Sequence, residues 1–254
     1  MKKIIEILIL VALILSIFYG LALIYLQING RGIIKETLRS YTGADVKIGR
    51  FNIRPLFNLE ISNLNIENTG KVQRIFISPS LLSGRLTLNK ILIEGLQLNY
   101  KRLPPAVVGE QIPVGKVEVT PQDLQGKGRA GFIIKHLQIR DGKINFVDYT
   151  VSPEGLKIAV KDLNFNLSNV YFLPVSQIAS FELNANIPWQ KGKQEGKIEA
   201  QGWLNLYKKD MQVTLKISDI DGIYLYPYYS KWVDLEKARI ESAKLNFTSN
   251  IRGL

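Results

Sequence analysis

The chain has 254 residues, a formal net charge of +11 and no cysteine. Its length is sufficient for one or two domains. The lack of cysteine excludes a disulfide framework, and a single histidine, His136, argues against a zinc site and a histidine-dependent catalytic triad. The positive charge is compatible with a basic surface that has no specific partner, or with attraction to anionic phospholipid or lipopolysaccharide. A nucleic-acid partner is not expected, because no basic run with interleaved aromatic residues occurs.

The N-terminal segment from Ile4 to Leu26 is almost entirely apolar and carries one charge, Glu6. At about 1.5 Å per residue a helix of this length spans roughly 34 Å, slightly more than the hydrocarbon core of a bilayer. A cleaved signal peptide has a shorter apolar region and a small-x-small exit, which Gly20-Leu21-Ala22 matches poorly. We therefore expect an uncleaved, single-pass signal anchor.

Charge alone does not set the orientation of this anchor, because lysine and arginine flank it on both sides. Only three residues precede the apolar segment, so an N-terminus inside the cell leaves the large remaining domain exported. Export without disulfides also agrees with the lack of cysteine. We therefore expect a bacterial inner-membrane protein whose C-terminal domain lies in the periplasm.

Most of the remaining chain has the alternating apolar pattern of β-strands, and one arrangement of it recurs. A short alternating run is followed by an even-length gap and then by a second run in the opposite phase. The four occurrences are Leu59-x-Ile61/Leu64-x-Ile66, Ile91-x-Ile93/Leu96-x-Leu98, Leu137-x-Ile139/Ile144-x-Phe146 and Ala238-x-Ile240/Leu245-x-Phe247. If the chain reverses or bulges inside the gap, both halves present their apolar side chains to one face.

At Asp141-Gly142 we expect the chain to reverse in a two-residue hairpin turn, which would pair Ile139 with Ile144 and Leu137 with Phe146. The predicted fold is mainly β: an N-terminal transmembrane helix and a short amphipathic helix, then an elongated, curved antiparallel sheet. The sheet is either an open trough or a partly closed barrel or sandwich. Burial of apolar surface favours both arrangements equally.

The pattern divides the chain into five expected segments. Between the two strand-rich sections, four prolines and five glycines lie in a stretch without strong periodicity, which indicates a loop or linker. The segments are 1–26, the N-terminal tail and membrane anchor; 27–43, the amphipathic helix, with Gly43 as its stop; 44–102, the first β section; 103–131, the Pro/Gly-rich loop; and 132–254, the second β section.

The polar and aromatic residues give no catalytic or cofactor site. His136 alternates with apolar neighbours and is expected on a strand surface. Asp141 and Asp148 are close enough in sequence to share a cation, but turn formation is the expected role of Asp141. No phosphate-binding glycine motif occurs. The aromatic residues from Tyr224 to Trp232 either pack in the core or form a patch at the membrane interface. We therefore expect no enzyme activity, no metal and no cofactor.

Several stretches in a fixed order resemble bacterial AsmA-like proteins, a superfamily that includes TamB-type and chorein-like lipid-transfer proteins. After the anchor, these stretches are 42–49 (TGADVKIG), 59–68 (LEISNLNIEN), 81–86 (LLSGRL), 93–95 (IEG), 137–148 (LQIRDGKINFVD), 225–228 (LYPY) and 238–247 (ARIESAKLNF). The resemblance implies an inner-membrane protein with a role in envelope integrity, outer-membrane biogenesis or phospholipid transport. Family members that bridge two membranes are usually much longer, so bridging is not implied here.

From this resemblance we expect an apolar β-sheet groove that contacts phospholipid or another acyl-chain lipid. The expected lipid-contacting residues are Leu59, Ile61, Leu64, Ile66, Ile91, Ile93, Leu96, Leu98, Leu137, Ile139, Ile144 and Phe146. The alternative is a non-catalytic structural or assembly factor with a closed core, which recruits an envelope protein through its sheet edges.

Overall fold

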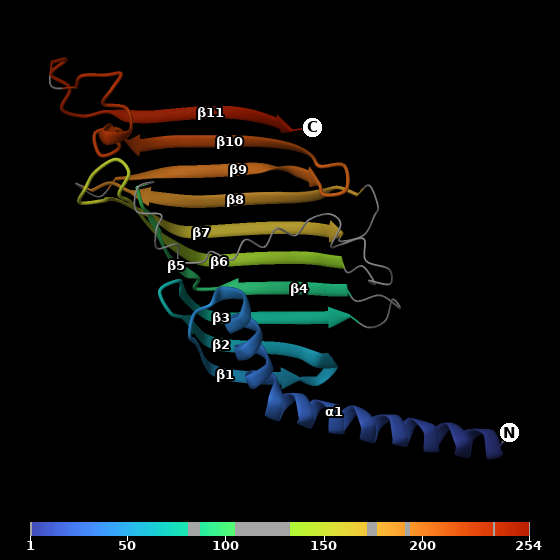
Figure 1. Cartoon of the computed structure of the whole chain (residues 1–254). Coiled ribbons are helices and arrows are strands. Elements are labelled where there is room, and N and C mark those ends of the chain that lie inside the picture. Colours follow the sequence, from blue (N-terminus) through green and yellow to red (C-terminus); the bar gives the residue numbers. More distant parts are fainter. Residues whose placement is uncertain are drawn as a thin grey trace.

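The computed structural model describes residues 2–80, 87–104, 133–171, 177–190, 194–235 and 237–253, with side chains from Tyr19 onward. Strands dominate it, as the sequence predicts (Figure 1). In chain order the elements are α1 (Lys2–Thr42), β1 (Val46–Arg54), η1 (Pro55–Phe57), β2 (Asn58–Ile66), β3 (Gly70–Ser80), β4 (Thr87–Glu94), β5 (Gln97–Arg102), β6 (Ile133–Asp148), β7 (Leu156–Tyr171), β8 (Ala179–Pro188), β9 (Glu195–Asn205), β10 (Asp210–Asp221), η3 (Tyr226–Tyr228) and β11 (Lys244–Gly253).

The eleven strands form one sheet in the order β1-β2-β3-β4-β6-β7-β8-β9-β10-β11, and β5 pairs with both β3 and β6. Most neighbours are antiparallel, but β4 and β5 both pair with β6 in parallel, so the sheet is mixed and the purely antiparallel prediction was wrong there. A parallel join needs a connection of about a dozen residues or more, whereas a hairpin needs two. The segment 103–132, which contains the predicted Pro/Gly-rich loop, makes this connection; its residues 105–132 lie outside the described part of the chain.

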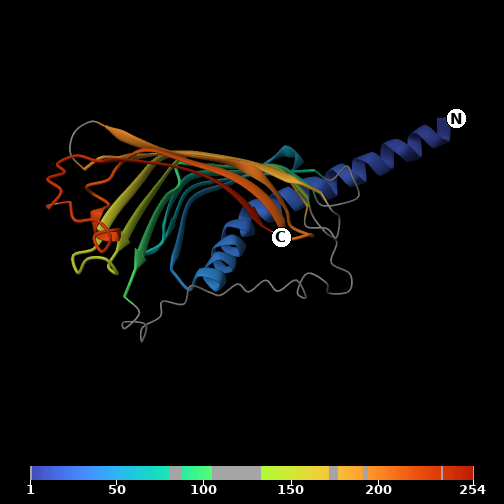
Figure 2. The ribbon, with the colours of Figure 1, turned by 90° about the horizontal axis from the view of Figure 1, so that it is seen from above.

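Helix α1 runs without a break through both the predicted anchor, 1–26, and the predicted amphipathic segment, 27–43. It ends where predicted: Gly43 has φ +66 and its N–H donates to the carbonyl of Arg39, the left-handed helix ending that glycine favours. Figure 2 shows one part of the helix extending away from the sheet and the other bending to lie against it.

Among the residues that the structure describes, no helix is long and apolar enough to cross a membrane.

The predicted hairpin at Asp141-Gly142 was wrong, because β6 continues through these residues as one strand of 16. The alternative, a bulge, is what occurs. Asp141 has φ +54. The register between β6 and β7 changes between Ile139 and Gly142, and it changes again between Gly142 and Ile144. A single residue in the left-handed region changes which face the following side chains take. The two apolar runs of this module therefore share a face within one strand.

Similar left-handed residues lie in a line across the sheet, which we call the bulge line. They are Asn63 in β2, Gly95 between β4 and β5, Asp141 in β6, Asp162 in β7 and Asp219 in β10, with φ between 51° and 62°. Gly95 is opposite Asp141, because Glu94 pairs with Arg140 and Gln97 with Lys143. Pairing also shifts at Asp162 and Asp219. The strands are visibly curved in the view from above (Figure 2).

The fourth predicted module was only half correct. Leu245 and Phe247 lie in β11, but Ala238 and Ile240 lie in a turn that precedes it. The N–H groups of Ala238 and Ile240 donate to the carbonyls of Asp234 and Leu235, so local turn bonds replace strand pairing there.

The bulge line predicts an unusual substitution pattern at the exposed residue Asp141. In Asp141→Val a β-branched side chain is forced to positive φ, so we expect a loss of about 1–3 kcal/mol in the free energy of unfolding. In Asp141→Gly the backbone conformation is favourable, so the change should stay within about 0.5 kcal/mol. Urea unfolding followed by tryptophan fluorescence measures both. Equal stability of the two variants would contradict the role of Asp141 as a bulge residue.

Candidate functional site: an apolar sheet face

The strand registers align apolar side chains in rows that run perpendicular to the strands. One row crosses eight neighbouring strands, which at about 4.8 Å between strands is a distance of roughly 34 Å. Its members are Ile61, Ile75, Ile93, Ile139, Phe165, Leu183, Ala200 and Leu215. A second row, beside it, contains Leu59, Ile77, Ile91, Leu137, Leu167, Phe181, Val213 and Ile251. Together they form one continuous apolar face.

The predicted lipid-contacting residues fall into three groups. Leu59, Ile61, Leu64 and Ile66 pack in one cluster, which is direct evidence that both halves of the first module share a face. Ile91, Ile93, Leu137 and Ile139 belong to the two rows. Beyond the bulge line, Leu98 pairs with Ile144, and Phe146 pairs with Tyr100, whose ring stacks on it at 5.6 Å between centroids. Leu96 lies outside the strands, and its carbonyl accepts a bond from the N–H of Lys143.

The apolar residues of β7 to β10 alternate as strand residues do, but they are not among the lipid-contacting residues that the sequence predicts. Phe165, Leu167, Phe181, Leu183 and Leu215 extend both rows toward β11. The missing information was the register, which shows that these strands continue the same face.

Helix α1 covers one end of this face, with Ile34 and Leu38 packed against the cluster of Val46, Ile48, Ile61 and Leu64. The remainder is more exposed. The row residues from Ile75 to Leu215 are only half-buried. On β11, Phe247 is 54% exposed and Ile251 is 40% exposed. Within the described ranges no second layer of helix or strand covers the face beyond α1, and Ile91, Leu137 and Leu167 pack against the buried cluster of Ile134, Val170 and Ala179.

The two edges of the sheet differ. At β1 the side-chain amide of Gln27 acts as a neighbouring strand would: its Nε2 donates to the carbonyl of Phe51 at 3.0 Å and its Oε1 accepts from the N–H of Ile53 at 2.8 Å. Arg31 donates to the carbonyl of Ile48. An edge occupied in this way is protected from pairing with another chain. In the described part of the chain β11 is the other edge, and it pairs with β10 on one side.

Asp148, at the end of β6, is the one fully buried carboxylate among the described residues. It accepts bonds from Thr150 N–H at 2.8 Å, Thr150 Oγ1 at 2.6 Å and Tyr228 Oη at 3.0 Å, and Arg102 lies 3.4 Å away. Burial alone would raise the pKa of Asp148, but the donors on Thr150 and Tyr228 and the charge of Arg102 hold it below its ordinary value. Asp148 thus joins β5, β6 and the segment around η3.

The cation site considered for Asp141 and Asp148 does not form. They are seven positions apart along one strand, a distance of roughly 23 Å, and Asp141 is exposed whereas Asp148 is enclosed by its own partners. Across the described residues no three metal-ligating side chains gather. His136 lies exposed on β6, with Nδ1 3.4 Å from Ser168 Oγ.

The aromatic cluster contains hydrogen-bonded tyrosines, of which Tyr228 is 37% exposed, and a tryptophan. The hydroxyls of Tyr224, Tyr228 and Tyr229 donate to Lys157 O, Asp148 Oδ2 and Gly222 O, and the Tyr226 and Tyr229 rings meet edge to face. Trp232 is 82% exposed. The tyrosine hydroxyls therefore hold the segment between β10 and β11 against the sheet, but none of these aromatic side chains is buried, so the core-packing alternative is not confirmed.

No family model and no curated protein matches the chain. The resemblance to AsmA-like proteins therefore stays a prediction.

The Asp148 network predicts a specific stability defect. Tyr228→Phe removes an O–H donor from a buried carboxylate, so the free energy of unfolding should fall by about 1–3 kcal/mol. Tyr207→Phe is the matched control, because Tyr207 is 60% exposed and should change stability little. Equal melting temperatures for the two variants would contradict the importance of this bond.

The same network predicts the pH range of stability. The pKa of Asp148 is lower in the folded state, so its contribution is present above the ordinary value of 3.8 and is lost as pH falls through the folded value. Burial, followed by the bond to Asp148, raises the pKa of Tyr228 to about 12, so its contribution is lost as pH rises above 10 and through 12. Thermal melts of the wild type and Tyr228→Phe across pH measure both limits, and the alkaline loss should be smaller in the variant.

Proposed function

We propose that this chain is an envelope lipid-handling protein that shelters acyl chains on the apolar face of its curved sheet. The observation that carries the proposal is the pair of apolar rows, which run from the α1 end toward β11, are broken in the second row at Gly202, and stay only half-buried. A folded protein in water gains nothing from a large accessible apolar surface unless that surface contacts something, and such surfaces mark ligand, membrane or partner sites.

The physical basis of the activity is exchange of environment. Each methylene moved from water to an apolar surface is stabilised by about 0.8 kcal/mol. Transfer of a whole acyl chain from a bilayer into water therefore has a large free-energy cost. Along the rows, an acyl chain passes from bilayer to protein with similar stabilisation at every position. The headgroup stays in water, and no bond is made or broken. The proposed mechanism therefore requires no catalytic residue or cofactor.

The N-terminal segment supports a membrane-attached form of this function. Residues 4–26 carry a single charge in the sequence, and α1 continues from them directly into the contact with β1 and β2. The accessible part of the face thus begins beside the proposed anchor. We propose that the anchor lies in a bacterial inner membrane and the sheet in the periplasm. The net charge of +11 would favour anionic phospholipid near the domain.

Site-specific photocrosslinking in cells tests the proposal. A benzophenone amino acid at Ile93, Ile139 or Leu183 should capture phospholipid, because these positions belong to one apolar row. The matched controls are Glu94, Arg140 and Glu182, which are the adjacent residues on the same strands and face the other side. Mass spectrometry of the adducts identifies the lipid. Equal capture from the two sets would overturn the proposal.

A second candidate, an assembly factor that recruits an envelope partner by strand addition, is favoured by one observation. Arg31 and Gln27 occupy the outer edge of β1, whereas Phe247 on β11 is 54% exposed. A partner strand would therefore add at β11. Its closed-core form is less favoured, because the described strands lie in one sheet. Stoichiometric recovery of a single envelope protein by crosslinks from β11, without lipid at Ile139, would favour it.

A further inference from the structure

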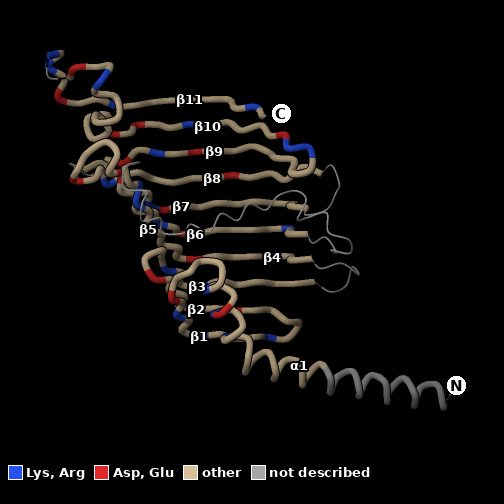
Figure 3. Tube along the Cα trace, in the orientation of Figure 1, with Lys and Arg blue, Asp and Glu red and all other residues tan. Residues whose placement is uncertain are grey.

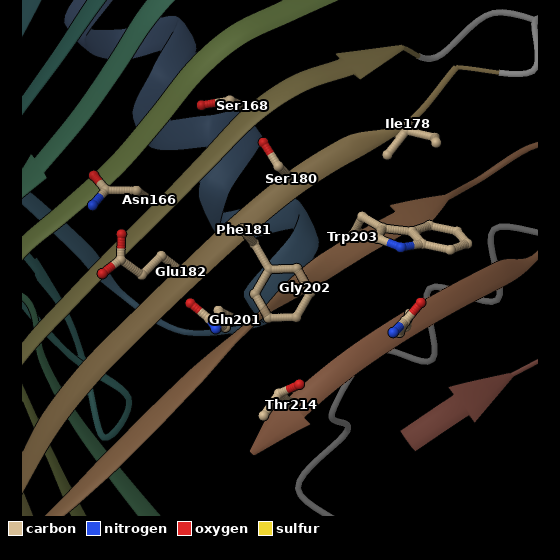
Figure 4. Close-up of a pocket in the computed structure, with 11 residues that line it drawn as sticks. Asn166, Ser168, Ile178, Ser180, Phe181, Glu182, Gln201, Gly202, Trp203 and Thr214 are labelled. Carbon is tan, nitrogen blue, oxygen red and sulfur yellow. The ribbon is translucent and has the colours of Figure 1, made fainter. Parts of the chain in front are cut away.

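The sheet face opposite α1 carries a regular grid of polar side chains on β7, β8, β9 and β10. In the first row Asn166 pairs with Glu182, Glu182 with Gln201 and Gln201 with Thr214. In the second row the paired residues are Ser168, Ser180, Trp203 and Gln212. Figure 4 shows the labelled members of these rows gathered over the four strands, with α1 behind the sheet.

These residues, together with Ile178, line a shallow hollow of about 680 Å³. Four strands at about 4.8 Å spacing give the grid a length of roughly 14 Å. At one end the half-buried indole of Trp203 lies beside Ile178, which is 56% exposed. The hollow thus combines the indole ring of Trp203 with many amide and hydroxyl groups that can form hydrogen bonds.

The grid has only one ionisable side chain and no basic one, in a chain with 33 lysines and arginines. Seven of the eight side chains are amides, hydroxyls or the indole, and Glu182 is the only ionisable one. The next row on the same face contains Asn164, Asn184, Glu199 and Lys216, and the Lys216 ammonium lies 3.7 Å from the Glu199 carboxylate in an ion pair. Charged residues are distributed along most of the strands (Figure 3), and a general solvated surface would be expected to carry several of them in the grid as well.

We propose that this polar hollow binds an uncharged carbohydrate chain. Amide and hydroxyl groups offer both donors and acceptors, which sugar hydroxyls require. The apolar ring faces of a sugar pack on an aromatic side chain such as Trp203, which also keeps a polar N–H available. An anionic headgroup or nucleic acid would need basic side chains, and the grid has none. The site lies on the face away from the proposed lipid-contacting rows, so it is a separate function.

Calorimetric titration of the full chain in phosphatidylcholine nanodiscs tests this proposal. The probes are maltotetraose, cellotetraose and tetra-N-acetylchitotetraose, and detergents with sugar headgroups are avoided because they would compete. We expect saturable binding of at least one probe. Trp203→Ala should weaken that binding by about tenfold or more, because aromatic residues dominate small interfaces, and Trp203→Phe should restore part of it.

Two further variants make the result decisive. Gln201→Ala with Gln212→Ala removes amides without touching the ring, and should also weaken binding by about tenfold. Trp232→Ala is the matched control, since Trp232 is 82% exposed and outside the grid, and should bind as the wild type does. Circular dichroism confirms that each variant is folded. Absence of saturable binding by all three probes, or unchanged binding in folded Trp203→Ala and in the double variant, would overturn the proposal.

Discussion

The structure depends on one geometric constraint: a strand that presents apolar residues in two opposite phases must contain a residue that resets the alternation. The left-handed residues of the bulge line, among them Asp141 and Asp162, provide this reset in strands as long as 16 residues. Without them, half of each long strand would turn its apolar side chains to the opposite face. Asparagine, aspartate and glycine occupy these positions because they tolerate positive φ best.

The same constraint separates the chemistry of the two faces. On β7 to β10 one face carries the apolar rows, and the other carries amides, hydroxyls and an ion pair. Direct pairing places the side chains of neighbouring strands about 5 Å apart on one face. The side chains of each row therefore touch and form a continuous surface. A single-layer sheet can thus offer an apolar ligand one side and a polar ligand the other, with no pocket enclosed between layers.

Stability in such a sheet cannot come from a large enclosed core, and the buried residues are accordingly local. Ile61 and Leu64 are buried under α1, and Asp148 is enclosed where β5, β6 and the η3 segment meet. Gln27 and Arg31 protect the β1 edge by hydrogen bonding to its backbone. The helix therefore has two structural roles, since it buries the first apolar cluster and closes one edge of the sheet.

The sequence alone indicated strands, one shared apolar face and the ending of α1 at Gly43, because alternation and left-handed glycine are local properties. It also identified the Asp141 region as a point where the phase changes, but it predicted a hairpin, since Asp-Gly is compatible with both a turn and a bulge. Only the tertiary structure decided that β6 continues, that β4 and β5 join it in parallel, and that Asp148 bonds to Tyr228 80 residues away. Register between distant segments is set by pairing and packing, and no local pattern in the chain encodes which strands become neighbours.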